Sequence, residues 1–292
     1  MPHQFTGTGV AIVTPFNEDK SIDYNSLEKL INHIIKGGIE YVVVLGTTGE
    51  SVTLSKEEKK EVVAFVVEKV AGRVPVVMGI GGNNTADVIH TAETFDLTGI
   101  SGILSVSPYY NKPSQKGIFE HFKAVAGAVS LPVIIYNVPG RTGSNISAAT
   151  TVKLASEVEN IVAVKEASGN LCQVMEIIAN KPADFGVISG DDALTYPMIT
   201  LGGCGVISVV ANSHPAEFSS MVRALLKNDI DTARPIQYKL LEYIGALFTE
   251  GSPPGIKAGL EIMDICKNVV RLPVVPVSDE LYNHIRTILK EI

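Results

Sequence analysis

One lysine, Lys165, stands where a reactive amine would be expected. It follows a short apolar run rich in β-branched residues, Ile161 to Val164, and precedes a segment typical of a turn, Glu166 to Asn170. Burial at such a position lowers the pKa of an amine, and the neutral amine attacks a carbonyl carbon to form a Schiff base. The alternative is a structural lysine whose stem packs at a strand end while its ammonium reaches solvent or Glu166.

Two further segments carry groups that suit a small anion. The segment Gly46-Thr47-Thr48-Gly49-Glu50 places two hydroxyls between glycines, where the backbone can approach a ligand closely; the alternative is a turn before a helix. Tyr136 ends another apolar run, and Arg141 follows in a proline-glycine turn. A guanidinium there suits bidentate binding of a carboxylate, although surface arginines are commonly only solvated.

Paired tyrosines and paired aspartates are also notable. Tyr109 and Tyr110 lie in a proline-flanked loop, where a phenol serves either as a proton donor or as part of an interface. Asp191 and Asp192 follow Gly190, and adjacent carboxylates suggest either a divalent metal ion or the N-cap of a helix. We expect the helix cap, and therefore no metal.

The composition excludes several classes of function. The chain has 292 residues, of which 46% are hydrophobic and 19% charged, and its formal net charge is -7. An acidic chain without a lysine or arginine block argues against nucleic acids and anionic membrane surfaces. Its three cysteines lack a C-x-x-C spacing and its six histidines form no metal-ligand pair. Without a basic and apolar leader at Met1 to Gln4, or a long apolar run, we expect a soluble cytoplasmic protein.

The glycines near residue 80 do not predict a nucleotide cofactor. Gly79-Ile80-Gly81-Gly82 lacks the Gly-x-Gly-x-x-Gly spacing of dinucleotide-binding loops. Small-molecule chemistry without a nicotinamide cofactor is therefore the expectation.

The positions of the apolar runs predict how these residues are held. Most runs lack polar alternation, which indicates burial on both faces as in parallel sheets. Eight candidate strands occur, at Gly9 to Val13, Tyr41 to Leu45, Val74 to Met78, Gly102 to Val106, Val133 to Tyr136, Ile161 to Val164, Phe185 to Ile188 and Gly205 to Val209.

Helical patterns separate these runs. One apolar stripe contains Leu27, Leu30, Ile31, Ile34 and Ile35, and helix starts are indicated by the capping-box form of Ser55 to Glu58 and by Thr85, Ser114 and Ser147.

Strand and helix alternate eight times, which favours an α/β fold of the (β/α)8 TIM barrel type over a doubly wound open sheet. We predict the barrel in residues 1–227 and a C-terminal helical extension in residues 228–292. Within the extension, helices are predicted at Thr232 to Phe248, Pro254 to Ile265 and Ser278 to Leu289.

The barrel prediction brings the candidate residues together. The carboxyl ends of barrel strands share one rim, where such enzymes place their sites. Thr47, Thr48, Tyr136, Lys165 and Gly190 all fall just past predicted strand ends. Core packing gives no reason to collect hydroxyls, a phenol and an amine there, so we interpret them as one site.

At these residues the chain resembles the pyruvate-dependent class I aldolase superfamily and, within it, the dihydrodipicolinate synthase family. The resemblance runs the whole length and rests on four segments: Gly46 to Glu50, Tyr136 to Gly143, Val164 to Gly169 and Ser189 to Asp192. The related N-acetylneuraminate lyases share the lysine, the tyrosine and a similar threonine loop, but usually lack the Pro-Gly-Arg-Thr-Gly turn. Arg141 therefore favours the synthase family.

The resemblance implies an enzyme that needs no cofactor beyond a covalent imine. Lys165 would condense with pyruvate, and the resulting enamine would attack L-aspartate 4-semialdehyde. Ring closure would give 4-hydroxy-tetrahydrodipicolinate, in lysine and diaminopimelate biosynthesis.

The resemblance also assigns roles to the neighbouring side chains. Tyr136 would pass protons through a relay completed by Thr48 and by Tyr110 of a neighbouring subunit. Thr47 and Thr48 would hold the pyruvate carboxylate, and Arg141 that of the semialdehyde.

Two further expectations follow from the resemblance. Gly190 and Ile207 would line the pocket. The assembly would be a homotetramer, a dimer of dimers.

A second site, for feedback inhibition by L-lysine, is present in some relatives at a subunit interface. The matching positions here are Ser51, Lys56, Lys59, Asn83, Asp87 and Tyr109. Relatives carry histidines at Lys56 and often at Lys59, and a glutamate at Asp87. A permanent cation near a cationic ligand is unfavourable and the shorter acid reaches less far, so we expect weak or absent inhibition.

Two other functions remain open from the sequence. One is a pyruvate lyase of the same superfamily that acts on a sialic acid or a sugar acid. The other is a non-catalytic barrel that serves as a binding protein, which predicts a disrupted lysine or tyrosine although both are present.

Overall fold

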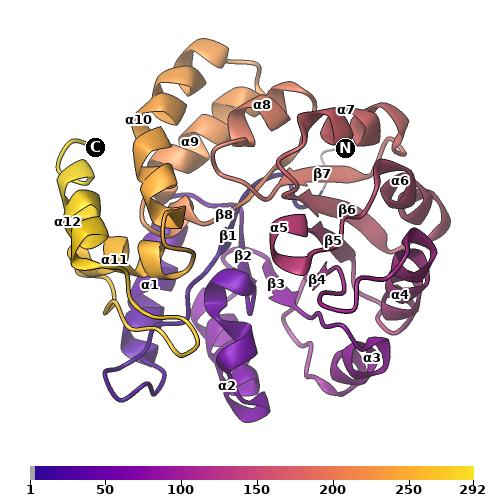
Figure 1. Cartoon of the computed structure of the whole chain (residues 1–292), viewed down its shortest axis with the longest axis horizontal. Coiled ribbons are helices and arrows are strands. Elements are labelled where there is room, and N and C mark those ends of the chain that lie inside the picture. Colours follow the sequence, from indigo (N-terminus) through magenta and orange to yellow (C-terminus); the bar gives the residue numbers. More distant parts are fainter. Residues whose placement is uncertain (1–3) are drawn as a thin grey trace.

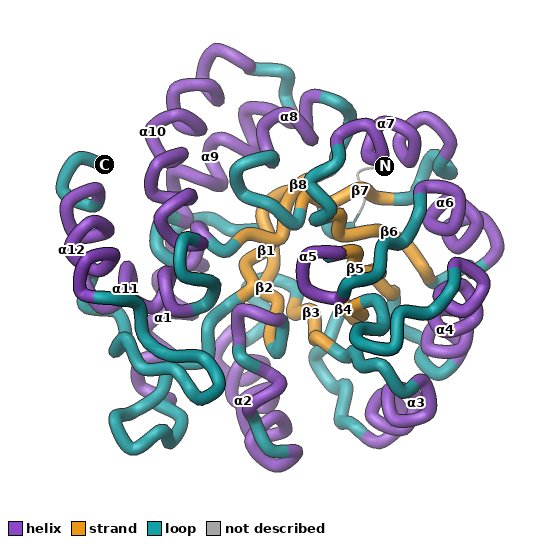
Figure 2. Tube along the Cα trace, viewed as in Figure 1, coloured by secondary structure: helices purple, strands orange, loops and turns teal. Residues whose placement is uncertain are grey.

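The computed structural model describes residues 4–292, and these residues form a closed barrel of eight parallel strands surrounded by helices (Figures 1 and 2). Met1 to His3, where the expected absence of a leader and one histidine fall, lie outside the described residues. Each strand pairs with the next along the chain, and β8 closes the barrel against β1. This arrangement confirms the predicted TIM barrel.

The strands are short and buried. They are β1 (Gly7–Ala11), β2 (Tyr41–Val44), β3 (Val76–Gly79), β4 (Gly102–Val106), β5 (Val133–Asn137), β6 (Ile161–Glu166), β7 (Gly186–Ser189) and β8 (Gly205–Ser208).

The outer layer is helical. Its α-helices are α1 (Tyr24–Lys36), α2 (Lys56–Val70), α3 (Thr85–Thr94), α4 (Gln115–Gly127), α5 (Pro139–Thr142), α6 (Ala148–Glu157), α7 (Leu171–Asn180), α8 (Thr195–Thr200) and α9 (Pro215–Leu226). Short 3-10 helices are η1 (Thr47–Gly49), η2 (Ser51–Thr53) and η3 (Val210–Asn212).

Amphipathic periodicity explains why these helices cover the barrel. In α1 the buried residues are Leu27, Leu30, Ile31 and Ile34, spaced so that they share one helix face. Ser55 forms the predicted capping box of α2, and Ser114 and Ser147 cap α4 and α6. The prediction for Thr85 was wrong by one residue, because the side chain of Asn84 accepts the hydrogen bond from Ala86 and Asn84 is the N-cap of α3.

The C-terminal helices lie together on one side of the barrel, next to α1 and α9 (Figure 1). They are α10 (Ile230–Phe248), α11 (Pro254–Ile262) and α12 (Asp279–Ile288), close to the predicted bounds. The predicted helical extension is therefore confirmed. The division at residues 227 and 228 stays a prediction; α9 ends at Leu226 and α10 begins at Ile230.

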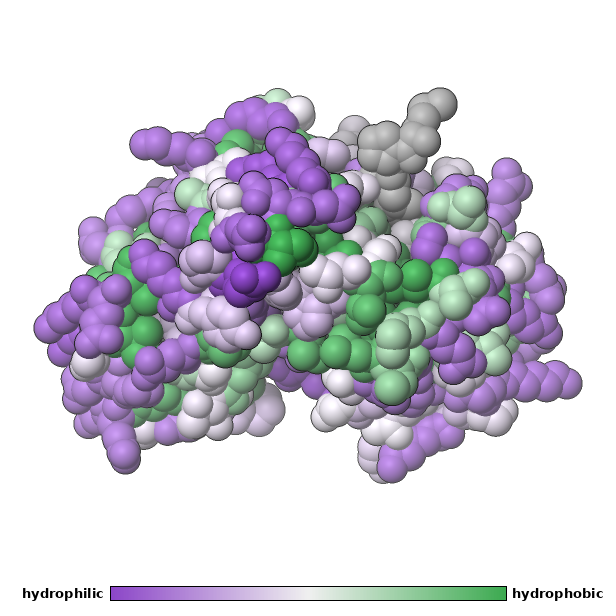
Figure 3. Space-filling view, turned by 90° about the horizontal axis from the view of Figure 1, so that it is seen from above, coloured by the Kyte–Doolittle hydropathy of each residue, from purple (hydrophilic) through white to green (hydrophobic). Residues whose placement is uncertain are grey.

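Two apolar layers result from the alternation of the strands. Side chains that point outward pack against the helices, whereas inward ones fill the barrel, among them Val43, Val77, Ile134, Ile188 and Ile207. The barrel is thus a packed core, and a site can open only at its rim. In Figure 3 the lower edge of the molecule, which is the face turned toward the viewer in Figure 1, is hollowed between two lobes.

Candidate active site

Strand β6 carries Lys165 as one of its own residues. The sequence placed Lys165 just past the strand end, and this was wrong. Lys165 pairs in register with Tyr136 of β5 and Ile188 of β7, and the strand continues to Glu166. The hydrophobic run stops at Val164, but backbone pairing with two neighbours extends the strand beyond it.

Because successive side chains of a strand point to opposite faces, Lys165 and Glu166 separate. Glu166 is directed away from the barrel interior, where it accepts hydrogen bonds from Asn137 Nδ2 at 3.0 Å, Gln173 Nε2 at 3.0 Å and the Ser168 backbone N–H at 2.7 Å. The alternative in which Lys165 pairs with Glu166 is therefore wrong.

Lys165 is buried without a partner charge. Lys165 is only 6% exposed, and its Nζ lies 4.3 Å from the centroid of the Tyr136 ring. Within residues 4–292, no carboxylate oxygen lies within 4.0 Å of that nitrogen. Burial lowers the pKa of Lys165 to about 8; Asp192 opposes this shift and Arg141 adds to it. The amine is therefore partly neutral near pH 7.

Gly190 leaves the space that the Lys165 stem occupies. A Cβ at Gly190 would lie 2.8 Å from the Ala167 Cβ and 3.0 Å from the Lys165 Cε. Both distances are shorter than van der Waals contact, so a side chain here would displace the lysine. The absence of a side chain at Gly190 therefore leaves room for the Lys165 side chain beside it.

The phenol of Tyr136 is a proton donor at neutral pH. Burial raises its pKa to about 12, Arg141 and a hydrogen bond with the Thr47 side chain oppose that shift, and Asp191 adds to it. A phenol with such a pKa stays protonated, so it moves protons only as a member of a hydrogen-bonded relay.

The segment Gly46 to Glu50, which we call the threonine loop, supplies the partner of Tyr136. Gly46 precedes η1 as its N-cap residue in an extended conformation, and η1 presents Thr47 at the surface while Thr48 is buried. The Thr14 hydroxyl donates to the Gly49 carbonyl at 2.7 Å and fixes the end of the turn. The segment that follows β1 thus holds the end of the loop, and Thr47 faces Tyr136.

Arg141 lies in α5, which the sequence predicted as a turn. Pro139 starts this short helix, and Gly143 ends it in the left-handed conformation at φ 66. The guanidinium donates to the Ser252 carbonyl at 3.3 Å. No carboxylate in the described part of the chain lies within 4.0 Å of it, so it is available for a carboxylate ligand.

A cavity of about 580 Å³ opens at this rim. Tyr136, Arg141 and Thr47 border it, and Lys165 lies directly beside Tyr136 inside the barrel. Among the other predicted residues, Thr48, Gly190 and Ile207 do not border the cavity: Thr48 is buried, Ile207 belongs to the inner core and Gly190 packs against the lysine.

Tyr110 is not part of the cavity of its own chain. Tyr110 lies in the loop after β4, is 89% exposed and has a backbone φ of 72. Tyr109 does border the cavity.

Most of the positions matched to lysine inhibition border the same cavity. Ser51, Lys59, Asn83, Asp87 and Tyr109 border it, whereas Lys56 does not. The Asn83 side chain donates to the Tyr109 carbonyl at 3.1 Å.

Asp192 is a member of the site that the sequence misassigned. We expected one aspartate of the pair to cap the next helix, but Asp192 Oδ2 accepts the backbone N–H groups of Val209 and Val210 at 3.0 and 2.8 Å, after β8. Burial raises its pKa to about 6, and its charge raises the pKa of Lys165. Asp191 bonds locally instead, because its Oδ1 accepts a hydrogen bond from the Ala193 backbone N–H at 2.9 Å.

The described residues 4–292 contain no group of three or more histidine, cysteine, aspartate or glutamate side chains arranged to hold a metal ion. None of the helices in that range is long and apolar enough to cross a membrane.

Comparisons with known proteins agree with this geometry. The model of the dihydrodipicolinate synthetase family matches residues 4–292. The 4-hydroxy-tetrahydrodipicolinate synthase of Parabacteroides distasonis is 51% identical over 286 residues, which cover 98% of this chain and 96% of that protein.

Solved structures are equally similar. Dihydrodipicolinate synthase from Aquifex aeolicus has a TM-score of 0.95 and 44% identity, with 98% of each chain covered. A structure described as the first monomeric dihydrodipicolinate synthase variant has a TM-score of 0.96 and 36% identity, covering 99% of this chain and 97% of its own. A barrel whose rim carries this lysine, tyrosine and arginine, in a chain matched along its length, belongs to the dihydrodipicolinate synthetase family.

Proposed function

We propose that this chain is a 4-hydroxy-tetrahydrodipicolinate synthase, which condenses pyruvate with L-aspartate 4-semialdehyde. The observation that carries the proposal is the buried Lys165, whose pKa is lowered to about 8 and whose Nζ lies against the Tyr136 ring. A partly neutral amine beside Tyr136, next to a cavity bordered by a guanidinium without a carboxylate partner, suits a keto acid and a second carboxylate. Names of relatives at about half identity over nearly the whole chain support the same reaction.

The chemistry begins at the lysine. Lys165 Nζ attacks C2 of pyruvate, the resulting carbinolamine loses water to give an imine, and loss of a C3 proton gives the enamine. Tyr136, hydrogen bonded to the Thr47 side chain, passes the protons of these steps, and the resemblance adds Thr48 to this relay. The threonine loop also binds the pyruvate carboxylate through its hydroxyls and backbone N–H groups.

The second substrate follows. The enamine carbon attacks the aldehyde carbon of L-aspartate 4-semialdehyde, whose carboxylate is bound by Arg141. The substrate amine then attacks C2, displaces Lys165 and closes the ring, so the enzyme is regenerated without any external cofactor. Gly190 leaves room for the Lys165 stem, and Ile207 packs in the core inside the barrel.

The assembly is the second part of the proposal. We infer a homotetramer, a dimer of dimers, in a soluble cytoplasmic enzyme, with Tyr110 reaching the relay of the neighbouring subunit. Its exposed side chain and its absence from its own cavity support a role in a partner. Because a monomeric variant exists among similar structures, sedimentation velocity is the required measurement.

The lysine response is the third part. We infer weak or absent inhibition by L-lysine, because Lys59 borders the part of the cavity that would receive the cationic ligand.

The experiment is an assay of pyruvate with L-aspartate 4-semialdehyde, coupled to reduction of the product, with pyruvate and N-acetylneuraminate tested separately as controls. We expect turnover only with the substrate pair. Lys165→Ala should abolish it while far-ultraviolet circular dichroism stays unchanged, and borohydride with pyruvate should add mass only at Lys165. Cleavage of N-acetylneuraminate, or an adduct on another lysine, contradicts the assignment.

A further inference from the structure

The C-terminal extension reaches into the loop that carries the threonines of the site. Lys257 of α11 is fully buried, and its Nζ donates to Glu50 Oε1 at 2.5 Å and to the Val269 carbonyl at 2.8 Å. Glu50 directly follows Gly49, the last residue of η1, and its second oxygen accepts the Arg271 backbone N–H at 3.0 Å. Two segments from the far end of the chain thus bind one carboxylate of the threonine loop.

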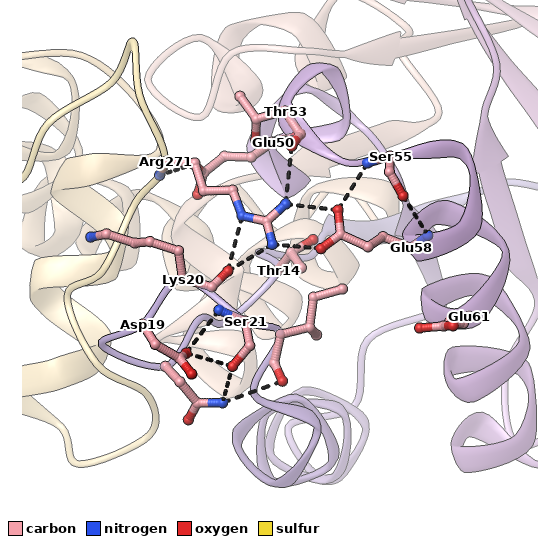
Figure 4. Close-up of polar contacts among 12 residues, drawn as sticks. Thr14, Asp19, Lys20, Ser21, Glu50, Thr53, Ser55, Glu58, Glu61 and Arg271 are labelled. Atoms are coloured by element: carbon pink, nitrogen blue, oxygen red, sulfur yellow. Dashed lines mark hydrogen bonds and ion pairs between the residues drawn. The ribbon is translucent and has the colours of Figure 1, made fainter.

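Arg271 binds further backbone around the same loop (Figure 4). Its guanidinium donates to both carboxylate oxygens of Glu58 at 2.6 and 2.8 Å, to the Thr53 carbonyl at 3.0 Å and to the Lys20 carbonyl at 2.7 Å. Both cations also contact the ring of Phe16, since Lys257 Nζ and the Arg271 guanidinium carbon lie 4.1 and 4.5 Å from its centroid. We call Glu50, Lys257 and Arg271 the loop clamp.

Backbone strain explains why the loop needs a clamp. Glu50 has φ 51, the left-handed region, and it joins η1 to η2. A residue with a Cβ adopts this conformation only where its surroundings impose it. The buried bonds from Lys257 and the Arg271 N–H hold Glu50 there, so they also fix the direction in which the preceding Thr47 and Thr48 point.

The clamp lies outside the chemistry. Glu50, Lys257 and Arg271 do not border the cavity, whereas Thr47 does, and the side chain of Thr47 hydrogen bonds to Tyr136. A group that cannot touch the substrate can still act by positioning one that does. Lys257 also carries a charge in a fully buried position, an arrangement that demands a paired partner and therefore a fixed geometry.

We propose that Lys257 and Arg271 are positioning residues that hold the threonine loop in the geometry that binds the keto acid. Lys257 and the Arg271 backbone N–H act through Glu50, and the Arg271 guanidinium acts through Glu58 and the Thr53 carbonyl of η2. The helical extension is then part of the catalytic unit. This inference rests on the proposed function for the identity of the keto acid.

The test measures the pyruvate adduct at Lys165, which needs no semialdehyde. Glu50→Gln keeps the shape of the side chain but removes its charge, and Lys257→Met removes the ammonium but keeps the stem. For each variant, the second-order rate constant of adduct formation is measured at low pyruvate by borohydride quenching and mass spectrometry, together with its pH midpoint. The KM values of both substrates are measured separately.

We expect the rate constant with pyruvate to fall at least tenfold and the pyruvate KM to rise by a similar factor. The semialdehyde KM should change less than threefold, and the pH midpoint of the reaction should stay in place. A loop that is merely destabilised gives a lower melting temperature with unchanged pyruvate kinetics in the folded protein, and that result overturns the proposal. Equal losses for both substrates overturn it as well.

A matched control lies at the other end of β2. Arg223 Nη1 and Glu40 Oε1 form an ion pair at 2.9 Å that also joins distant segments, α9 and the residue before β2. Arg223→Met should lower stability and leave both KM values unchanged. If Lys257→Met does not fold, Glu50→Gln and Arg271→Lys decide the question by the same readouts.

The outcomes separate the two proposals. A wild-type protein that forms the adduct but does not use the semialdehyde refutes the proposed function and leaves the clamp testable. A wild-type protein with full turnover, whose clamp variants keep the pyruvate rate constant, refutes the clamp alone.

Discussion

The reactivity of Lys165 should follow a titration near pH 8. Burial lowers its pKa from 10.5 to about 8, which corresponds to about 3 kcal/mol of disfavoured charge. Because the neutral amine is the nucleophile, the rate of imine formation rises as pH increases through the pKa and levels off above it. At pH 7 roughly 9% of the amine is neutral, compared with about 0.03% for an unperturbed lysine.

The magnitude is distinctive between pH 7 and 9. A pKa near 8 predicts an increase of about tenfold followed by a plateau, whereas an ordinary lysine predicts about a hundredfold with no plateau below pH 10. Tyr136 does not interfere, because its pKa is raised to about 12 and its phenol stays protonated over this range.

The assay is adduct formation at limiting pyruvate. Aliquots taken at each pH are quenched into excess borohydride in one common buffer, and the modified fraction of the peptide that contains Lys165 is measured by mass spectrometry. Arg141→Ala should move the midpoint upward, because the arginine charge helps to lower this pKa. A hundredfold rise without a plateau in the wild-type protein would refute the argument from burial.

Three more changes test the site. Gly190→Ala should slow adduct formation at least tenfold and lower the free energy of unfolding by about 1–3 kcal/mol, measured by denaturant titration, because the added Cβ would lie 3.0 Å from the Lys165 Cε; an unchanged adduct rate contradicts the role of the glycine. Arg141→Ala should raise the semialdehyde KM at least tenfold and leave the rate of pyruvate adduct formation at pH 9, above the midpoint, within threefold; comparable losses in both count against its role. L-lysine at millimolar concentration should inhibit turnover by less than half, and half-inhibition at micromolar concentration would end that idea.

The fold was predictable because most strand residues are apolar. All eight runs coincide with strands, and their ends differ by at most two residues, as at β1, where the strand begins at Gly7 and not Gly9. The difference between predicted and observed strand ends matters most at β6, because it changes the position of Lys165. Hydrophobicity ends at Val164, yet the strand continues through Lys165 and Glu166 because hydrogen bonds to neighbouring strands, invisible in one sequence, decide where it stops.

The site was predictable where one residue type implies its own chemistry. Lys165 and Tyr136 near strand ends, and Arg141 a few residues beyond, are residue types whose chemistry can be recognised in a sequence, and the structure brings Lys165 and Tyr136 into contact. The loop clamp could not be predicted from the sequence, because Glu50 and Lys257 are 207 residues apart and each resembles an ordinary surface charge. The role of Asp192 could not be predicted for the same reason, because its hydrogen-bond partners Val209 and Val210 follow a different strand.

The extension of β6 creates the reactivity of its lysine. The backbone N–H of Ala167 donates to the Asn137 carbonyl and that of Gly190 donates to the Glu166 carbonyl, so the chain stays extended past Lys165. Extended geometry forces two adjacent charged side chains to opposite faces, where Glu166 receives its hydrogen bonds and Lys165 receives an aromatic ring. A turn directly after Val164 would let the two charges meet, and their attraction would raise the lysine pKa instead of lowering it. A slip of one residue in this register would exchange them and leave a carboxylate where the reaction needs an amine.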